Sequence, residues 1–289
     1  MTPSVRSFHH AASGSWTHVV ADPDSGAAAI VDPVLDFEPA GGRVRTDAAE
    51  GVLAYVVASG LTIEWILETH AHADHLSAAQ WIKCRSGGRV GIGAGIVEVQ
   101  RRFRQLLELD TGFATDGSQF DRLFLPDECV VVGDLRLRVM ATPGHTCDGV
   151  SYLVGDAVFV GDTLFAPSAG TARCDFPGAD AGVLYRSIRS LYQLPGSTRV
   201  FLCHDYPQAG APPTALTSIA DEKAGNVHLD ENTGEADFVS RRRARDATLA
   251  VPRLLWSALQ VNIRAGHLPP ATAGGRRYLK VPIESDSSF

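Results

Sequence analysis

The segment that most constrains this chain is a cluster of three histidines and one aspartate within seven residues. It runs from Thr69 to His75 and directly follows the apolar run 63–67. That run predicts a β-strand leading to His70, and the residues from His75 to Ile82 predict a helix. A loop at a strand end is held by rigid elements while its side chains face solvent, as in many catalytic sites. So dense a set of imidazoles beside a carboxylate indicates a metal site.

Three further strand ends each supply one candidate ligand: His145 after the strand ending at Met140, Asp162 after the strand 157–160, and His204 after the apolar run 200–202. Taken singly, each has an ordinary explanation. Gly-His and Gly-Asp pairs are common in turns, and a lone histidine is more often a core or surface residue than a ligand. The order of all these residues along the chain favours one metal centre assembled from several strand ends.

Composition excludes several other classes of protein. The chain has 289 residues, 45% of them hydrophobic, with a net charge of -7 and a pI near 5.8. This balance offers no basic field for nucleic acid, and the apolar runs are too short to span a membrane. The first six residues lead into polar sequence without a signal-peptide pattern, so we expect a cytoplasmic protein. Five cysteines without a C-x-x-C pair indicate neither a disulfide framework nor a zinc knuckle.

Strand-like and helical patterns alternate along the chain and predict an α/β sandwich with helices covering the sheets. The expected strands are 27–31, 135–140, 150–154 and 157–160, and the expected helices are 48–59, 76–84, 96–109 and 182–191.

We expect a single domain over residues 1–289, with a C-terminal elaboration after about residue 207 and no long linker before it. Within that elaboration the arginine run 241–245 predicts a solvated helix face. The alternative for this run is a dock for an anionic substrate.

The ligand pattern His-x-His-x-Asp-His, followed by His145, Asp162 and His204, resembles the metallo-β-lactamase superfamily. The resemblance implies an αββα sandwich with metals at one edge, and Asp32 matches the family's structural aspartate beneath the site. In a two-zinc hydrolase of the glyoxalase II type, Asp162 would bridge two sets of ligands: His70, His72 and His145 at one zinc, and Asp74, His75 and His204 at the other. All seven residues are present, so hydrolysis of a glutathione thioester is one alternative function.

The surrounding stretches resemble persulfide dioxygenases more closely, including the bacterial β-lactamase hydrolase-like type. They are 68–79, 89–93, 173–176, 204–206, 259–266 and 278–280. This resemblance implies one Fe(II) per chain, held by His70, His145 and Asp162 as a facial triad. The implied reaction converts glutathione persulfide, O2 and water to sulfite and glutathione, and redox-inert zinc cannot support it.

Under that interpretation the remaining four positions (His72, Asp74, His75 and His204) would not bind the iron but would hydrogen-bond the groups around it. Arg173 and Tyr206 match glutathione-contacting positions of the family. Their ordinary alternatives are a surface ion pair with Asp175 and a packed aromatic ring. A further alternative is a metal- or persulfide-binding module without turnover. Pairing into a homodimer through 96–109 is also an expectation.

Overall fold

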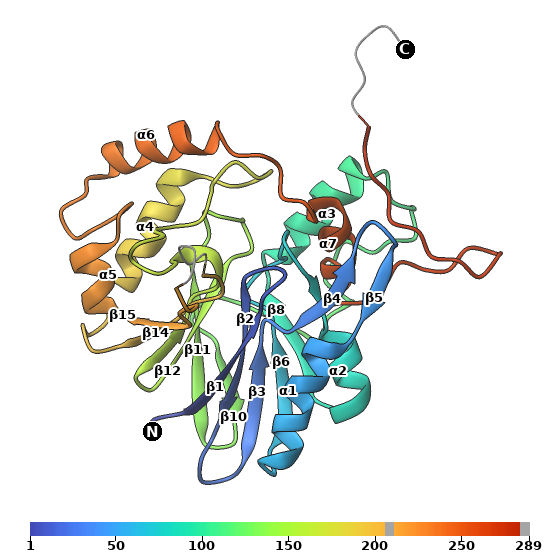
Figure 1. The fold of residues 1–289 in the computed structure, drawn as a ribbon, viewed down its shortest axis with the longest axis horizontal. Coiled ribbons are helices and arrows are strands. Elements are labelled where there is room, and N and C mark those ends of the chain that lie inside the picture. The colour runs from blue at the N-terminus through green and yellow to red at the C-terminus, as the bar shows by residue number, and fades with distance from the viewer. Residues whose placement is uncertain (206–210, 284–289) are drawn as a thin grey trace, which may run out of the picture.

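The computed structural model describes residues 1–205 and 211–283. Two six-stranded sheets lie face to face at its centre (Figure 1). The first sheet has, in spatial order, β1 (Ser4–His10), β2 (Ser15–Ala21), β3 (Ala27–Val31), β6 (Thr62–Leu67), β8 (Arg89–Gly93) and β9 (Arg122–Phe124). The second has β10 (Cys129–Val132), β11 (Leu135–Ala141), β12 (Val150–Val154), β13 (Ala157–Phe159), β14 (Arg199–Phe201) and β15 (Leu216–Ser218).

The central strand β3 shows how one strand serves two apolar layers. All five of its residues are buried, and successive side chains point to opposite faces of the sheet. Ala29 and Val31 pack toward the second sheet with Tyr152 and Phe159. Ile30 packs on the other face, in a cluster built with the covering helices. The unbroken apolar run 27–31 is therefore the signature of a strand covered on both sides.

Helices cover the outer face of each sheet. The cluster on the first sheet includes residues of α1 (Asp47–Ala58), α2 (Ala79–Ser86), α3 (Ile96–Leu106) and α7 (Leu255–Asn262). The cluster on the second sheet includes residues of α4 (Ala181–Leu191), α5 (Ile219–Gly225) and α6 (Glu235–Asp246). The αββα sandwich predicted from the sequence is confirmed.

The helix expected from residue 76 begins later than the sequence pattern indicates. Leu76 and Ser77 form the short strand β7, which pairs with Leu35 and Val34 of β4 (Val34–Glu38) in a small sheet completed by β5 (Arg43–Arg45). α2 then begins at Ala79, whose N–H donates to Ser77 Oγ at 3.0 Å. Pairing with a distant strand thus replaces the first helical turn.

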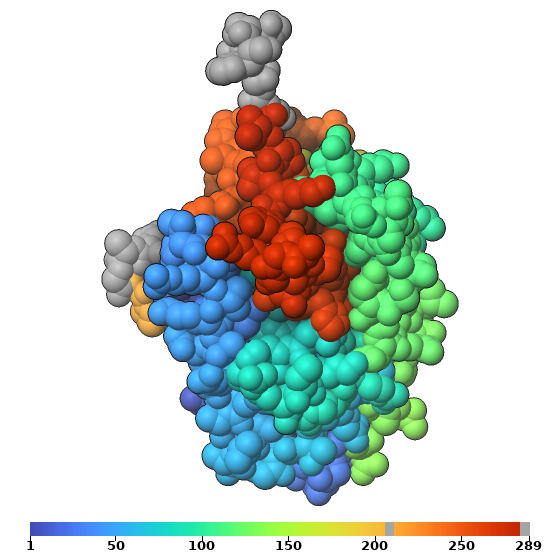
Figure 2. All heavy atoms as spheres, turned by 90° about the vertical axis from the view of Figure 1, so that its right-hand side faces the viewer, coloured from blue at the N-terminus to red at the C-terminus, as the bar shows by residue number. Residues whose placement is uncertain are grey.

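The C-terminal part of the chain returns to the first half of the molecule. Figure 2 shows it, in red, packed between the blue and green segments. α7 contacts β7, and Lys280 Nζ donates to the carbonyls of Leu107 and Glu108 just after α3. Over the described ranges, none of the helices has the length and apolar character that crossing a bilayer requires.

Candidate metal centre

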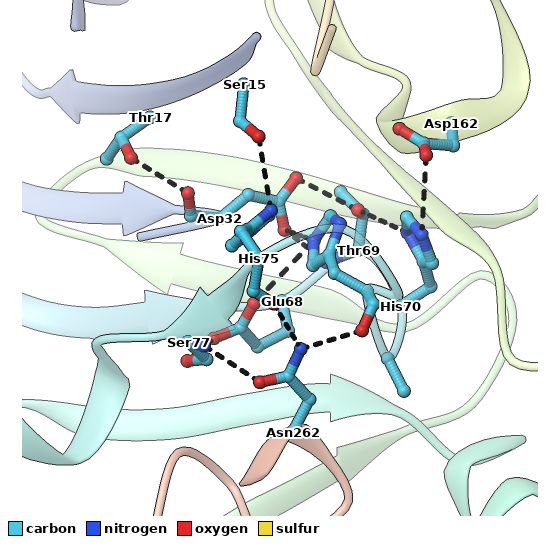
Figure 3. Close-up of polar contacts among 12 residues, drawn as sticks. Ser15, Thr17, Asp32, Glu68, Thr69, His70, His75, Ser77, Asp162 and Asn262 are labelled. Carbon is cyan, nitrogen blue, oxygen red and sulfur yellow. Dashed lines mark hydrogen bonds and ion pairs between the residues drawn. The ribbon is translucent and has the colours of Figure 1, made fainter. Parts of the chain in front are cut away.

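The loop that follows β6 carries four of the predicted site residues and is tied down by one distant side chain. Asn262 Nδ2 donates to the carbonyls of His72 and His75, at 2.8 and 2.9 Å, and Asn262 Oδ1 accepts from Ser77 N at 2.8 Å. Figure 3 shows the Asn262 amide beneath the loop, with its contacts to the backbone on either side. The C-terminal helix α7 therefore fixes the backbone that presents the histidines.

Three strands of the second sheet deliver the other site residues. His145 follows β11, Asp162 lies in the short 3-10 turn Gly161–Thr163 after β13, and His204 follows β14. Gly161 has a φ of 53°, and a Cβ atom there would lie 2.5 Å from Thr69 Oγ1. Only glycine allows the Asp162 turn to come so close to the histidine loop.

His70, His145 and Asp162 converge from different elements. Asp162 Oδ2 lies 3.8 Å from His70 Nε2 and 3.6 Å from His145 Nε2. The three side chains each place one ligand atom within 4.8 Å of the others. His70 Nε2 is buried and has no hydrogen-bond partner among the described residues. Two imidazoles and a carboxylate around a buried, unpaired nitrogen fit a bound metal ion.

Hydrogen bonds on the far side of both rings fix which nitrogen faces the centre. Thr69 Oγ1 donates to Asp32 Oδ2 at 2.9 Å, so it accepts from His70 Nδ1, which lies 3.1 Å away. His145 Nδ1 donates to the carbonyl of Arg173 at 2.7 Å. With Nδ1 protonated in both rings, each Nε2 is left with a lone pair that could bind a metal.

An unusual backbone conformation places Asp32 where its carboxylate can bind Thr69. It follows β3 with a φ of 50°, a left-handed region that aspartate tolerates better than most residues. Its carboxylate also accepts the Thr69 N–H at 2.7 Å. The early aspartate thus anchors the start of the histidine loop.

The other four predicted residues form a second group next to the first. Asp74 Oδ2 accepts from Ser15 Oγ at 3.1 Å and lies 3.1 Å from His75 Nδ1 and 3.3 Å from His204 Nε2. His72 Nε2 lies 3.0 Å from Asp32 Oδ1. Ligand atoms of all four residues come within 4.8 Å of one another. Asp162 joins the two groups, because its other oxygen, Oδ1, lies 3.3 Å from His204 Nε2.

Charges and burial set the protonation of the centre. Burial, followed by the neighbouring ring of His72, lowers the pKa of His70 well below its usual value. Burial alone would raise the pKa of Asp162, but the imidazoles of His204, His70 and His145 hold it below its usual value. A neutral imidazole beside an ionised carboxylate is the state in which these groups bind metal.

A cavity of about 570 Å³ opens onto the centre. Asp74, His145 and Asp162 line it together with apolar and cationic side chains. Arg173 also lines it, but its guanidinium makes two bonds of 2.6 Å to Asp175 and a third, of 2.7 Å, to the Ala250 carbonyl. The ion pair that was the ordinary alternative for Arg173 is therefore present. The other predicted substrate residue, Tyr206, lies outside the described residues.

Some residues of the site carry no signal in the sequence alone. Asp148 is buried and accepts from the Ala71 N–H at 2.8 Å, and Asn262 binds the same loop from the C-terminal helix. A single Asp or Asn beside a glycine or in a helix is common, so neither stands out. The stretch 259–266, which contains Asn262, is distinguished in the sequence only by its resemblance to bacterial relatives.

Comparison with known proteins shows to which family this chain belongs. The sequence profile of the metallo-β-lactamase superfamily matches residues 12–204. A probable metallo-hydrolase of Burkholderia pseudomallei is 46% identical, with 98% of this chain and 99% of that protein aligned. A protein named Glyoxylase B2 from Dictyostelium discoideum is 43% identical over 96% of this chain and 95% of its own length.

A β-lactamase hydrolase-like protein of Xylella fastidiosa is 46% identical over 98% of this chain, which spans 65% of that relative's length. Among solved structures, ETHE1 from Myxococcus xanthus matches with a TM-score of 0.73 and 30% identity, covering 91% of this chain and 100% of its own. The profile and the aligned relatives identify this chain as a member of the metallo-β-lactamase superfamily.

Proposed function

We propose that this protein is an iron(II)-dependent dioxygenase that oxidises glutathione persulfide to sulfite. In the net reaction, glutathione persulfide, O2 and water give glutathione and sulfurous acid. The terminal sulfur takes up all three oxygen atoms as its bond to the glutathione sulfur breaks, and O2 is the oxidant. At neutral pH the sulfurous acid releases protons.

The observation that supports this proposal most is the arrangement of His70, His145 and Asp162, whose ligand atoms face one another from three different elements. His70 and His145 each have Nδ1 bound to an oxygen behind the ring, which leaves both Nε2 atoms facing Asp162. In the second group, the Asp74 carboxylate is already bound to Ser15 and His75, whereas His72 lies 3.0 Å from Asp32 without a hydrogen bond. The first group has the donor types of a facial triad for one metal ion.

The chain's own residues would do most of the positioning. His70, His145 and Asp162 would hold the iron, which when bound supplies open positions for a sulfur anion and O2 and exchanges electrons with them. Phe176 packs edge-on against His145, with 5.2 Å between the ring centres, and Phe165 lines the same cavity. These rings form an apolar part of the cavity wall beside the ligands. The Arg173 carbonyl holds the His145 ring in its orientation.

Hydrolysis of a glutathione thioester by two zinc ions is the second candidate. Asp162 favours it, because its two oxygens face different groups: Oδ2 lies near His70 and His145, and Oδ1 lies near His204. The similarity to a protein named Glyoxylase B2 points the same way. For such a site to form, Asp74 would have to exchange its bonds to Ser15 and His75 for a metal, whereas both ring nitrogens of His72 are already without a hydrogen bond.

Metal analysis and assay of the same preparation test the proposal. Protein purified without oxygen should contain one iron per chain, consume O2 and form sulfite from glutathione persulfide, and the zinc-loaded protein should be inactive. Two zinc ions per chain, with thioester cleavage and no O2 uptake, would establish the hydrolase instead.

Single substitutions locate the metal. We expect His145→Ala and Asp162→Ala to abolish iron retention, because each removes one of three protein ligands. His204→Ala should keep the iron and lose only part of the activity. His267→Ala, which removes an exposed histidine after α7, is the matched control and should change neither. Stoichiometric iron in either ligand variant would disprove the assignment.

A further inference from the structure

A second cavity, of about 230 Å³, adjoins the large one along helix α6. We call it the α6 chamber; its walls are formed by Val227, His228, Phe238, Arg241, Arg242 and Arg245. Four of these residues also line the large cavity that reaches the metal ligands: Val227, His228, Arg242 and Arg245. A molecule that enters the large cavity can therefore extend one end into the chamber.

The three arginines of the chamber differ in their partners. Arg242 is buried, is bound to Asp246 at 2.6 and 2.9 Å, and donates to the Thr171 carbonyl at 3.1 Å. Arg241 reaches only a backbone carbonyl on its own helix, that of Asp237, at 3.4 Å. Neither Arg241 nor Arg245 forms an ion pair within ranges 1–205 and 211–283, in contrast to the pair between Arg242 and Asp246. The expected solvated face of 241–245 is thus interrupted by a buried, paired arginine.

The wall of the chamber is electropositive as a whole. Burial, together with the charges of Arg242, Arg245 and Arg241, lowers the pKa of His228 to about 4, so its ring is neutral. His228 Nδ1 accepts the Thr171 N–H at 2.9 Å, which holds the ring in place. No carboxylate is among the described residues that line the chamber. Two exposed guanidinium groups that form no ion pair among the described residues, beside a neutral ring, can receive an anion.

We propose that the α6 chamber binds a carboxylate of the glutathione moiety, with Arg245 and Arg241 as its donors and Arg242 as the buried support of the wall. The inference rests on the proposed glutathione-derived substrate. Arg173 is less suited to bind the anionic end of the substrate, because its guanidinium already donates to Asp175 and to the Ala250 carbonyl. Arg245 and Arg241 form no ion pair among the described residues and can bind it instead. A carboxylate held there would leave the sulfur end free to reach the metal ligands.

Calorimetric binding of reduced glutathione to the metal-loaded full chain tests this subsite without turnover. We expect Arg245→Gln to weaken binding about tenfold, the effect of losing one hydrogen bond to a charged group, and Arg241→Gln to weaken it in the same direction. Arg243→Gln is the matched control, since Arg243 is exposed on the same helix but lines neither cavity, and it should bind as the unmodified protein does.

A second ligand identifies the group that is recognised. Glutathione diethyl ester, which lacks both carboxylates, should bind the unmodified protein about tenfold more weakly than glutathione does, and Arg245→Gln should largely remove this preference. In turnover, the KM for glutathione persulfide should rise in Arg245→Gln while kcat stays unchanged.

The outcomes separate the subsite from the function. Unchanged glutathione affinity in both Arg241→Gln and Arg245→Gln would overturn the subsite, whatever the enzyme does with persulfide. Tight glutathione binding that depends on Arg245, in a protein that forms no sulfite, would support the subsite and overturn the dioxygenase. If the unmodified protein binds no glutathione, the subsite fails, and sulfite formation from glutathione persulfide still decides whether the protein is the dioxygenase.

Discussion

Thr69 stands between the carboxylate of Asp32 and the ring of His70, and its hydroxyl contacts both of them. It donates to Asp32 Oδ2 and accepts from His70 Nδ1. We predict that Thr69→Val, which keeps the shape of the side chain but removes the oxygen, lowers iron affinity about 10- to 100-fold, as loss of a ligand's hydrogen-bond partner commonly does. Competition against a chelator of known affinity measures the change.

Thr69→Ser is the control for this prediction, because it retains the hydroxyl and loses only a methyl group. It should keep most of the iron affinity. Equal losses in the Val and Ser variants would mean that the packing of the methyl group, rather than the hydrogen bond to His70, holds the ring.

The sequence predicts some residues of the site and misses others. The pattern of histidines and aspartates is dense enough to mark all seven candidate residues, and the structure brings them together at one edge of the sandwich. Asn262 is different: it lies 190 positions from His72 along the chain, yet its amide binds the His72 carbonyl. A contact over that separation exists only after α7 has packed, so no local pattern encodes it.

At the scale of elements, helix α5 carries a buried acid that should make stability depend on pH. Burial raises the pKa of Glu222 to about 8, above the usual value of 4.5. Between these values the folded protein keeps a proton that the unfolded chain has lost. The free energy of unfolding should therefore fall as pH rises through this window, by up to about 1.4 kcal/mol per pH unit from this residue.

Glu222→Gln should remove that dependence, because glutamine resembles the protonated acid and its carbonyl can still accept from Asn226 Nδ2, which lies 2.7 Å from Glu222 Oε2. We predict that the variant gains stability relative to the unmodified protein between pH 5 and about 8, and that the gain levels off above that. Urea denaturation at several pH values measures it. Exposed Glu231→Gln should give no such gain, and a parallel pH profile for Glu222→Gln would contradict the prediction.

Elements also show where local patterns mislead. The apolar spacing after His75 fits a helix, but Leu76 and Ser77 pair with β4, and Ser77 is held by Asn262 and by a hydrogen bond to Glu68. The strands were easier to predict, since a run buried on both faces, such as 27–31, is apolar throughout. Local propensity predicts a helix or strand correctly where the packing of the folded protein favours the same structure. In the ligand loop, tertiary contacts override the local helical pattern.

At the scale of the whole molecule, the site is a junction between the two halves of the sandwich. His70 comes from the end of a strand in the first sheet, whereas His145 and Asp162 follow strands of the second. The αββα order was predictable because each strand and its covering helix carry their own pattern. The register that brings the strand ends together depends on pairing between distant segments, such as β3 with β6 and β13 with β14.

This junction makes metal binding a determinant of stability. The three proposed ligands lie 75 and 17 positions apart in the chain, from 70 to 145 to 162, so the unfolded chain does not present them together. A metal that binds only the folded state stabilises it by about 2.7 kcal/mol at a hundredfold excess over the dissociation constant.

We predict that the melting temperature of the chelated protein rises steadily with the logarithm of added iron(II), under anaerobic conditions in a scanning calorimeter. Asp162→Ala should show no such rise, whereas His267→Ala should follow the unmodified protein. A melting temperature that stays constant while one iron binds per chain would mean that the unfolded chain binds iron as tightly as the folded protein, which would contradict a site assembled only on folding.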